Sequence, residues 1–95
     1  MIRHIVVFSV ADDQREQLAG LVDDLRALPG QIDVIEALAV GRPLNDSPFD
    51  CALTVDLADE DALEAYRGHP AHQPVLDRLR KVAEEIVVAD IDVSP

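Results

Sequence analysis

Apolar and polar residues alternate over the first ten positions of the chain, a pattern typical of a strand. One set of alternating positions shares a face: Ile2, His4, Val6, Phe8 and Val10. The other face contains Ile5 and Val7. We therefore expect a strand over residues 2–10 that needs cover on both faces.

A helical period follows the first strand. The apolar residues recur every third or fourth position: Leu18, Leu21, Val22, Leu25 and Leu28. Asp12 or Asp13 is a suitable N-cap, and Asp13 with Glu16 has the spacing of a capping box. Pro29 and Gly30 predict the end of this helix.

Two further strands are predicted in the middle of the chain, over residues 32–40 and 49–57. The intervening segment 43–48 is rich in turn-forming residues and is short enough to join neighbouring antiparallel strands. The lone cysteine, Cys51, has no partner for an internal disulfide. Because it lies in phase with apolar residues of the third strand, we expect a small buried side chain.

The remaining pattern predicts a broken helix and a last strand. Asp59 is a suitable N-cap for a helix that ends near Gly68, because Pro70 disfavours helix at His69. A second helical piece begins near residue 71 or 74, and its apolar stripe consists of Val75, Leu76, Leu79, Val82 and Ala83. The closing strand is expected over residues 86–93.

This β-α-β-β-α-β order predicts one α+β domain over residues 1–95, with an antiparallel sheet and both helices on one face. The first and last strands are apolar on both sides, so the second face of the sheet would be left as an exposed apolar patch. Association of two copies through their sheet faces removes that exposure. We therefore expect a homodimer.

The charge balance excludes one class of partner. Acidic residues outnumber basic ones by 19 to 8, which gives a formal net charge of −11. Such a field repels phosphate backbones, and we expect no nucleic-acid partner.

The chain opens directly into a strand pattern and has no apolar run long enough to span a bilayer. We therefore expect no membrane partner and a cytoplasmic location.

The polar side chains able to exchange protons gather in one segment, where Tyr66, His69 and His72 lie within seven residues, and His4 lies on the inner side of the first strand. Imidazole titrates near neutral pH and a phenol donates hydrogen bonds, so this set suits proton transfer beside a carbonyl group. The alternative is a structural role in packing and helix capping. Pro70 separates the last two histidines and no acidic residue follows at ligand spacing, so we expect no metal site.

Three features stand out together: the segment Tyr-x-x-His-Pro-x-His at residues 66–72, the Arg3-His4 pair and the strand end Val40-Gly41. With these features, the chain resembles the stress-responsive A/B barrel domain (Dabb) family over nearly its whole length. The resemblance implies a ferredoxin-like fold that forms a dimeric α+β barrel. One departure is Asp33-Val34, which stands where many relatives have Pro-Gly.

A few relatives of that family act as polyketide cyclases that need no cofactor or metal. By resemblance, His72 removes a proton between carbonyl groups and Tyr66 holds the developing oxyanion. His4 and His69 would line the substrate pocket, and Val6 and Phe8 would help to enclose a hydrophobic part of a small carbonyl compound between sheet and helices.

Three other functions stay open: a non-catalytic module that binds small molecules, a stress-associated structural dimer, and a cofactor-independent monooxygenase of the same barrel superfamily. The chain has only three aromatic residues, Phe8, Phe49 and Tyr66. This leaves little surface to stack on a large planar ligand and disfavours the monooxygenase.

Overall fold

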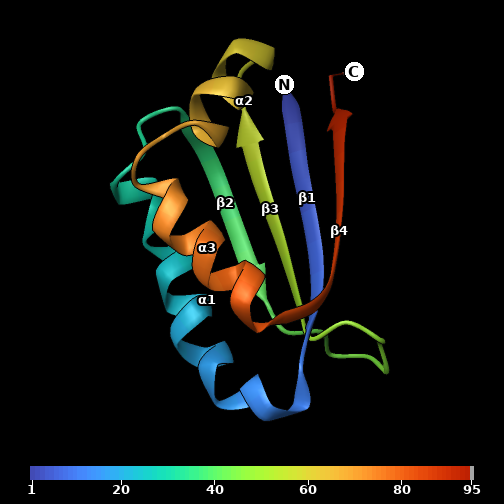
Figure 1. Ribbon diagram of the computed structural model, residues 1–95. Coiled ribbons are helices and arrows are strands. Elements are labelled where there is room, and N and C mark those ends of the chain that lie inside the picture. Colours follow the sequence, from blue (N-terminus) through green and yellow to red (C-terminus); the bar gives the residue numbers. More distant parts are fainter. Residues whose placement is uncertain (95) are drawn as a thin grey trace.

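The computed structural model describes residues 1–94. Its four strands form one antiparallel sheet with the order β2-β3-β1-β4 (Figure 1). The strands are β1 (Ile2–Val10), β2 (Ile35–Gly41), β3 (Cys51–Leu57) and β4 (Ala83–Asp92). The helices are α1 (Leu18–Arg26), α2 (Glu60–Arg67) and α3 (His72–Val82), with short 3-10 helices at Asp12–Gln17 and Leu28–Gly30. The predicted α+β order is confirmed.

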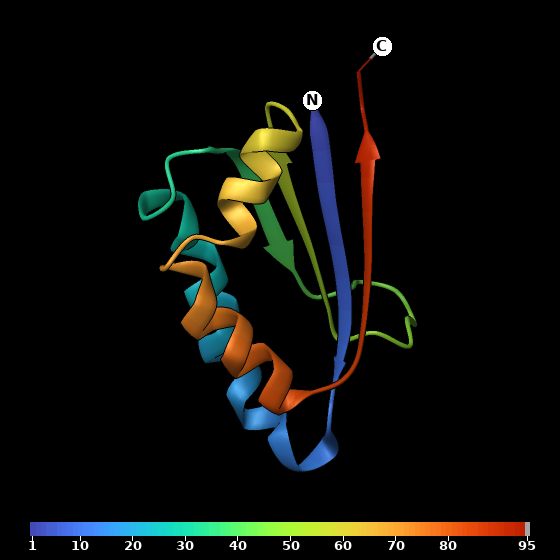
Figure 2. The same ribbon diagram turned by 45° about the horizontal axis from the view of Figure 1, so that its top comes forward.

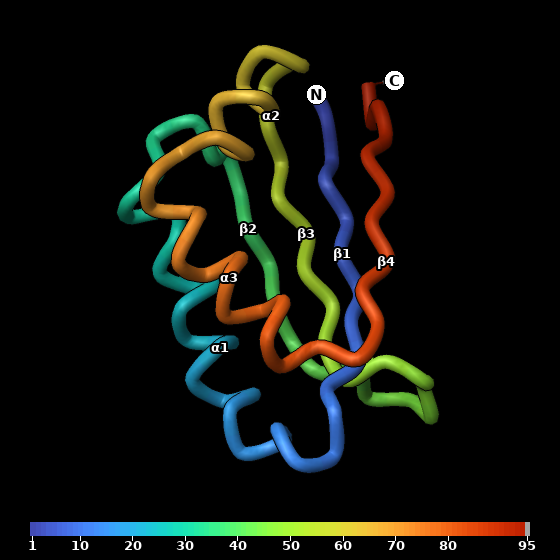
Figure 3. The backbone as a smooth tube through the Cα atoms, in the orientation of Figure 1, coloured from blue at the N-terminus to red at the C-terminus, as the bar shows by residue number. Residues whose placement is uncertain are grey.

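The helices lie on one face of the sheet, as Figures 1 and 2 show. The tube in Figure 3 shows β4 beside β1 at the edge of the sheet farthest from α1. Since directly paired residues of antiparallel strands project to the same face, the buried positions of β1 define an inner face toward the helices. We call the opposite side the outer face.

The hydrophobic core lies between the inner face and the helices. Its fully enclosed apolar side chains include Phe8 of β1, Leu21 of α1 and Leu57 of β3, each 0% exposed. Cys51 is buried and has no disulfide partner, as predicted, and burial raises the pKa of its thiol. The core therefore covers the inner faces of β1 and β3.

Several predicted boundaries move by a few residues. The capping box is wrong, because residues 12–17 form a 3-10 helix and neither helix start in this segment has a side-chain cap. Asp12 instead accepts a hydrogen bond from Arg15 Nε. Strand β2 begins at Ile35, so residues 32–34 lie before it and not in it as predicted. Ile32 is fully buried, and its backbone N–H donates to the Leu28 carbonyl.

The Asp59 cap is confirmed, since its carboxylate accepts a hydrogen bond from Ala62 N at 2.8 Å. Strand β4 begins at Ala83, three positions before the predicted start, because α3 ends at Val82 without an intervening loop. Among residues 1–94, no helix combines the length and the apolar character needed to cross a bilayer.

Candidate functional site

Tyr66 lies at the centre of the predicted cluster. Its side chain comes from the last turn of α2 and is only 1% exposed. The ring centroid of Tyr66 lies 4.5 Å from that of His72, at the start of α3, and 5.6 Å from that of His4, on β1. The fold thus brings together three of the four polar residues predicted for the site.

The connection between α2 and α3 places His72 next to Tyr66. Helix α2 ends at Arg67, and the backbone turns through Gly68 and Pro70 before α3 begins. The fourth predicted residue, His69, stabilises this turn, because its Nδ1 accepts a hydrogen bond from Ala71 N at 3.0 Å. A contact of His69 with substrate stays a prediction.

The hydrogen bonding of His72 leaves one ring nitrogen available. Its Nδ1 lies 3.2 Å from the Arg67 carbonyl oxygen, which only accepts, so Nδ1 carries the proton in this contact. In the neutral ring, Nε2 is then the acceptor. Burial lowers the pKa of His72, and the hydrogen bond to Arg67 offsets part of this effect. A neutral imidazole with an accepting Nε2 suits a general base.

His4 is held by a carboxylate that sequence analysis did not single out. His4 Nδ1 lies 2.6 Å from Asp90 Oδ1 on β4, which directs Nε2 away from the carboxylate. The second oxygen of Asp90 accepts a hydrogen bond from Arg67, whose guanidinium also pairs with Glu64 at 2.9 Å. One feature of the sequence could have pointed to Asp90. It is in phase with Val88 in the last strand, and this places it on the inner face.

The Tyr66 hydroxyl has no hydrogen-bond partner among residues 1–94. Every fully enclosed side-chain nitrogen or oxygen in the described chain has a partner, so this hydroxyl is not fully enclosed, although Tyr66 as a whole is only 1% exposed. Burial of the ring raises the pKa of Tyr66 to about 12. The phenol therefore stays protonated across the physiological range and can donate a hydrogen bond to a ligand.

The two predicted apolar contacts lie in the closed core, since Val6 is 5% and Phe8 is 0% exposed. Their contact with a substrate stays a prediction. Their partners on β4 face the same way but are open: Val88, opposite Val6, is 51% exposed, and Ile86, opposite Phe8, is 37% exposed. These two side chains form an accessible apolar strip on the inner face of β4, next to Asp90.

Within residues 1–94, no three His, Cys, Asp or Glu side chains are grouped so that they would hold a metal ion. The histidines of the site are instead arranged around an aromatic ring, with one carboxylate on His4. The chemistry available from these side chains is proton transfer and hydrogen bonding.

Residues 2–93 match the family described as the Stress Responsive A/B Barrel Domain. An uncharacterized protein of Streptomyces coelicolor, SCO4036, is 37% identical over 93 residues, covering 92% of this chain and 95% of the relative. Two solved structures of unknown function have a TM-score of 0.86 each. A dimeric ferredoxin-like protein from Thermobifida fusca is 28% identical, with 97% of this chain and 90% of that chain covered. A dimeric protein with a ferredoxin-like fold from Bacteroides fragilis is 26% identical, with 96% and 94% covered. The chain belongs to the stress-responsive A/B barrel domain family.

Proposed function

We propose that the cluster of Tyr66, His72, His4 and Asp90 catalyses a cyclase-like aldol reaction of a small hydrophobic carbonyl compound, without a cofactor. The observation that carries this proposal is the pairing of Tyr66 and His72, with ring centroids 4.5 Å apart. Tyr66 offers an uncommitted donor and His72 an accepting Nε2. A donor beside a base is the arrangement that enolate formation needs.

In the proposed reaction, His72 Nε2 removes a proton from a carbon between two carbonyl groups. The electron pair of that C–H bond forms a C=C bond as the π pair of one carbonyl group moves onto its oxygen. The Tyr66 O–H donates to the resulting enolate oxygen. The enolate carbon then attacks a second carbonyl carbon of the same molecule and forms the new C–C bond. The alkoxide receives the proton from the His72 imidazolium, so the enzyme ends in its starting state.

Asp90 acts in this proposal as a positioning residue. It fixes the tautomer of His4 through Nδ1, and its contact with Arg67 connects β4 to the end of α2. His4 Nε2 then faces the site as a second hydrogen-bonding group for the polar end of the substrate. The strip of Ile86 and Val88 beside Asp90 supports a substrate with an apolar portion, because burial of that portion removes exposed apolar surface on both sides.

The chain also acts, in our proposal, as a homodimer joined through the outer faces of its sheets. The dimeric relatives at 26% and 28% identity support this assembly. The exposed apolar side chains of the outer face support it as well, since Val87 and Ile91 are each 44% exposed. The cytoplasmic location and the absence of nucleic-acid and membrane partners stay predictions.

The test is turnover of a panel of poly-β-keto compounds by the natural protein, His72→Gln and Tyr66→Phe, with product ring closure followed by mass and absorbance. We expect ring closure by the natural protein and a loss of about a hundredfold or more in either variant. Equal rates in all three proteins would remove the assigned roles. Binding of the panel without turnover would identify a binding module, and oxygen-dependent products would identify a monooxygenase.

A further inference from the structure

The flank of α3 that faces away from α1 contains an exposed arginine. Arg78 marks the other flank, where it pairs with Asp24 of α1. An α-helix turns by about 100° per residue, so Arg80 lies about 200° around α3 from Arg78. Leu79 lies between the two arginines and is buried against the sheet. Arg80 is therefore exposed on the flank of α3 nearest β4.

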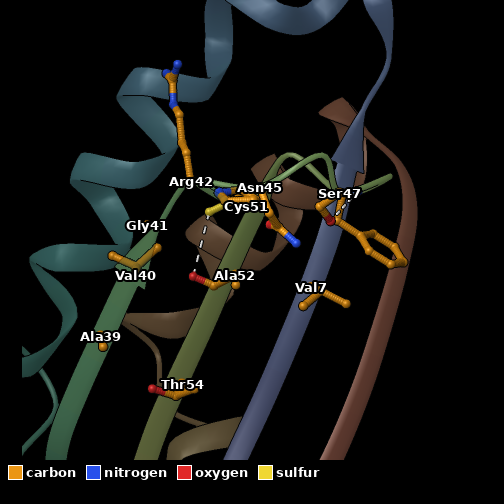
Figure 4. A pocket seen from close by; sticks show the side chains of 12 residues that line it. Val7, Ala39, Val40, Gly41, Arg42, Asn45, Ser47, Cys51, Ala52 and Thr54 are labelled. Atoms are coloured by element: carbon orange, nitrogen blue, oxygen red, sulfur yellow. Dashed lines mark hydrogen bonds between the residues drawn. The ribbon is translucent and has the colours of Figure 1, made fainter.

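The guanidinium of Arg80 is uncommitted. Within residues 1–94 it forms neither an ion pair nor a hydrogen bond, whereas Arg67 and Arg78, the other arginines of α2 and α3, pair with carboxylates. Arg42 also has no carboxylate partner in the described chain, but it borders a hollow of about 580 Å³ over Ala52 on the outer face (Figure 4). Arg80 is thus the unpaired arginine on the side of the candidate site.

Two rows of side chains connect Arg80 to that site. His72, Leu76 and Arg80 follow at four-residue spacing along α3, with a rise of about 12 Å from the first to the last. On β4, the inner positions 86, 88 and 90 span about 13 Å. Helix α3 passes directly into β4 at Ala83, and the two elements diverge from this junction toward the end of the sheet where α2 lies (Figure 2). Both rows therefore run from the level of Arg80 to the level of Tyr66.

The charge of Arg80 also reaches His72. Burial lowers the pKa of His72 most, and the positive charges of His4 and Arg80 lower it further. A coulombic effect of this kind requires that the two ends of the α3 row lie within electrostatic range of each other. A ligand that contacts His72 can therefore interact with Arg80 through its other end.

The surface between the two rows is apolar and uncovered. Val88 is 51% and Ile86 is 37% exposed, and Leu76 is half-buried. A molecule that extends along this surface from Tyr66 meets a positive charge at its far end, in a chain whose net charge is −11. A carboxylate suits that charge, because a guanidinium binds it through two parallel N–H···O bonds. A doubly charged phosphate would meet stronger repulsion from the rest of the chain.

We propose that the substrate of the candidate site carries a carboxylate at the end remote from its reacting carbonyl, and that Arg80 binds this carboxylate. The proposal rests on the function proposed above and adds the chemical class of the substrate, a keto acid with an apolar segment between its two polar ends. The reacting carbonyl lies beside Tyr66 and His72, and the apolar segment covers Leu76 and Val88. Arg80 takes part in no covalent step and orients the substrate through its far end.

Comparison of acids with their esters tests the proposal. The probes are linear acids in which methylene chains of increasing length separate a terminal methyl ketone from the carboxylate, each paired with its methyl ester. Each probe holds a single ketone, so ring closure does not interfere with dissociation constants measured by calorimetry. The variant is Arg80→Gln, and Lys81→Gln is the matched control. Lys81 lies in the same last turn of α3 but about 100° farther around the helix, so its loss has the same effect on the helix dipole.

We expect the natural protein to bind the best acid about tenfold more tightly than its ester, with the highest affinity where the carboxylate lies about 12 Å from the ketone. Arg80→Gln should bind acid and ester equally, and Lys81→Gln should keep the preference. Absence of binding, equal binding of acid and ester by the natural protein, or an equal loss in both variants would overturn the role of Arg80.

The same comparison separates this proposal from the proposed reaction. Ring closure of poly-β-keto acids and their esters at equal kcat/KM would overturn the binding of a carboxylate by Arg80 and leave the reaction standing. A preference for the acid that depends on Arg80, without ring closure of any compound in the panel, would support the binding role and remove the reaction.

Discussion

Replacement of Tyr66 by phenylalanine separates catalysis from folding at the centre of the candidate site. The variant keeps the ring, which is 1% exposed and packs against His72 and His4 with centroids 4.5 and 5.6 Å away. It removes only a hydroxyl without a hydrogen-bond partner among residues 1–94. We therefore expect the free energy of unfolding to change by less than about 1 kcal/mol.

The catalytic effect should be much larger. Loss of one donor to an oxyanion lowers kcat by about 10²–10³, or about 3–4 kcal/mol of transition-state stabilisation. The assay is ring closure of the best poly-β-keto substrate, with kcat and KM measured separately and stability measured by urea unfolding. Tyr66→Ala serves as the contrast, since the loss of the ring should cost about 3–5 kcal/mol of stability.

Two results would refute this reasoning. A folded Tyr66→Phe protein with kcat within twofold of the natural value would show that the hydroxyl does not stabilise the transition state. A fall in the activity of the natural protein near pH 10 that is absent from Tyr66→Phe would show that the phenol ionises there, whereas burial raises the pKa of Tyr66 to about 12.

The remaining predictions concern pH, substrate size, positioning and the core. Burial lowers the pKa of His72 in the folded state, so the unfolded state takes up the proton at a higher pH than the folded state does. The free energy of unfolding should therefore fall as pH falls below about 6.5. Urea unfolding of His72→Gln should show a weaker pH dependence in this window. Val88→Thr should raise KM about fivefold for a long-tailed substrate and leave KM for a short one unchanged, which the same assay measures. Asp90→Ala should lower kcat with a smaller effect on KM, and an unchanged kcat would exclude the positioning role. Phe8→Ala should cost about 3–5 kcal/mol in urea unfolding because its side chain is fully buried, and a cost below about 1 kcal/mol would contradict the described core.

Much of the fold could be predicted because its signals are local and periodic. Alternation over residues 2–10 and the helical stripe that begins at Leu18 depend on which residues share a face, and burial follows that division. The Asp59 cap and the break at Pro70 are equally local, since each acts on backbone groups within a few residues. The start of β2 was harder to predict, because Ile32 is buried without belonging to a strand. Strand β3 begins at Cys51, two positions after its predicted start at residue 49.

The candidate site was predictable only in part. Tyr66 and His72 come from one short segment whose spacing permits them to act together, and the structure places their rings 4.5 Å apart. Asp90 is 86 positions from His4 in the chain, and no local pattern predicts that pairing. The sequence also did not show that Val6 and Phe8 are buried whereas Val88 is exposed, because all three residues belong to the same apolar alternation.

The sequence by itself determined the order of elements, the apolar character of both sheet faces and the grouping of Tyr66 with the nearby histidines, because these properties follow from residue spacing along the backbone. The tertiary structure decided which strands became neighbours, and therefore that β4 brings Asp90 to His4 and leaves Val88 uncovered. It also placed large and small residues at opposite edges of the outer face. These features depend on strand pairing across long chain separations, which the sheet as a whole selects.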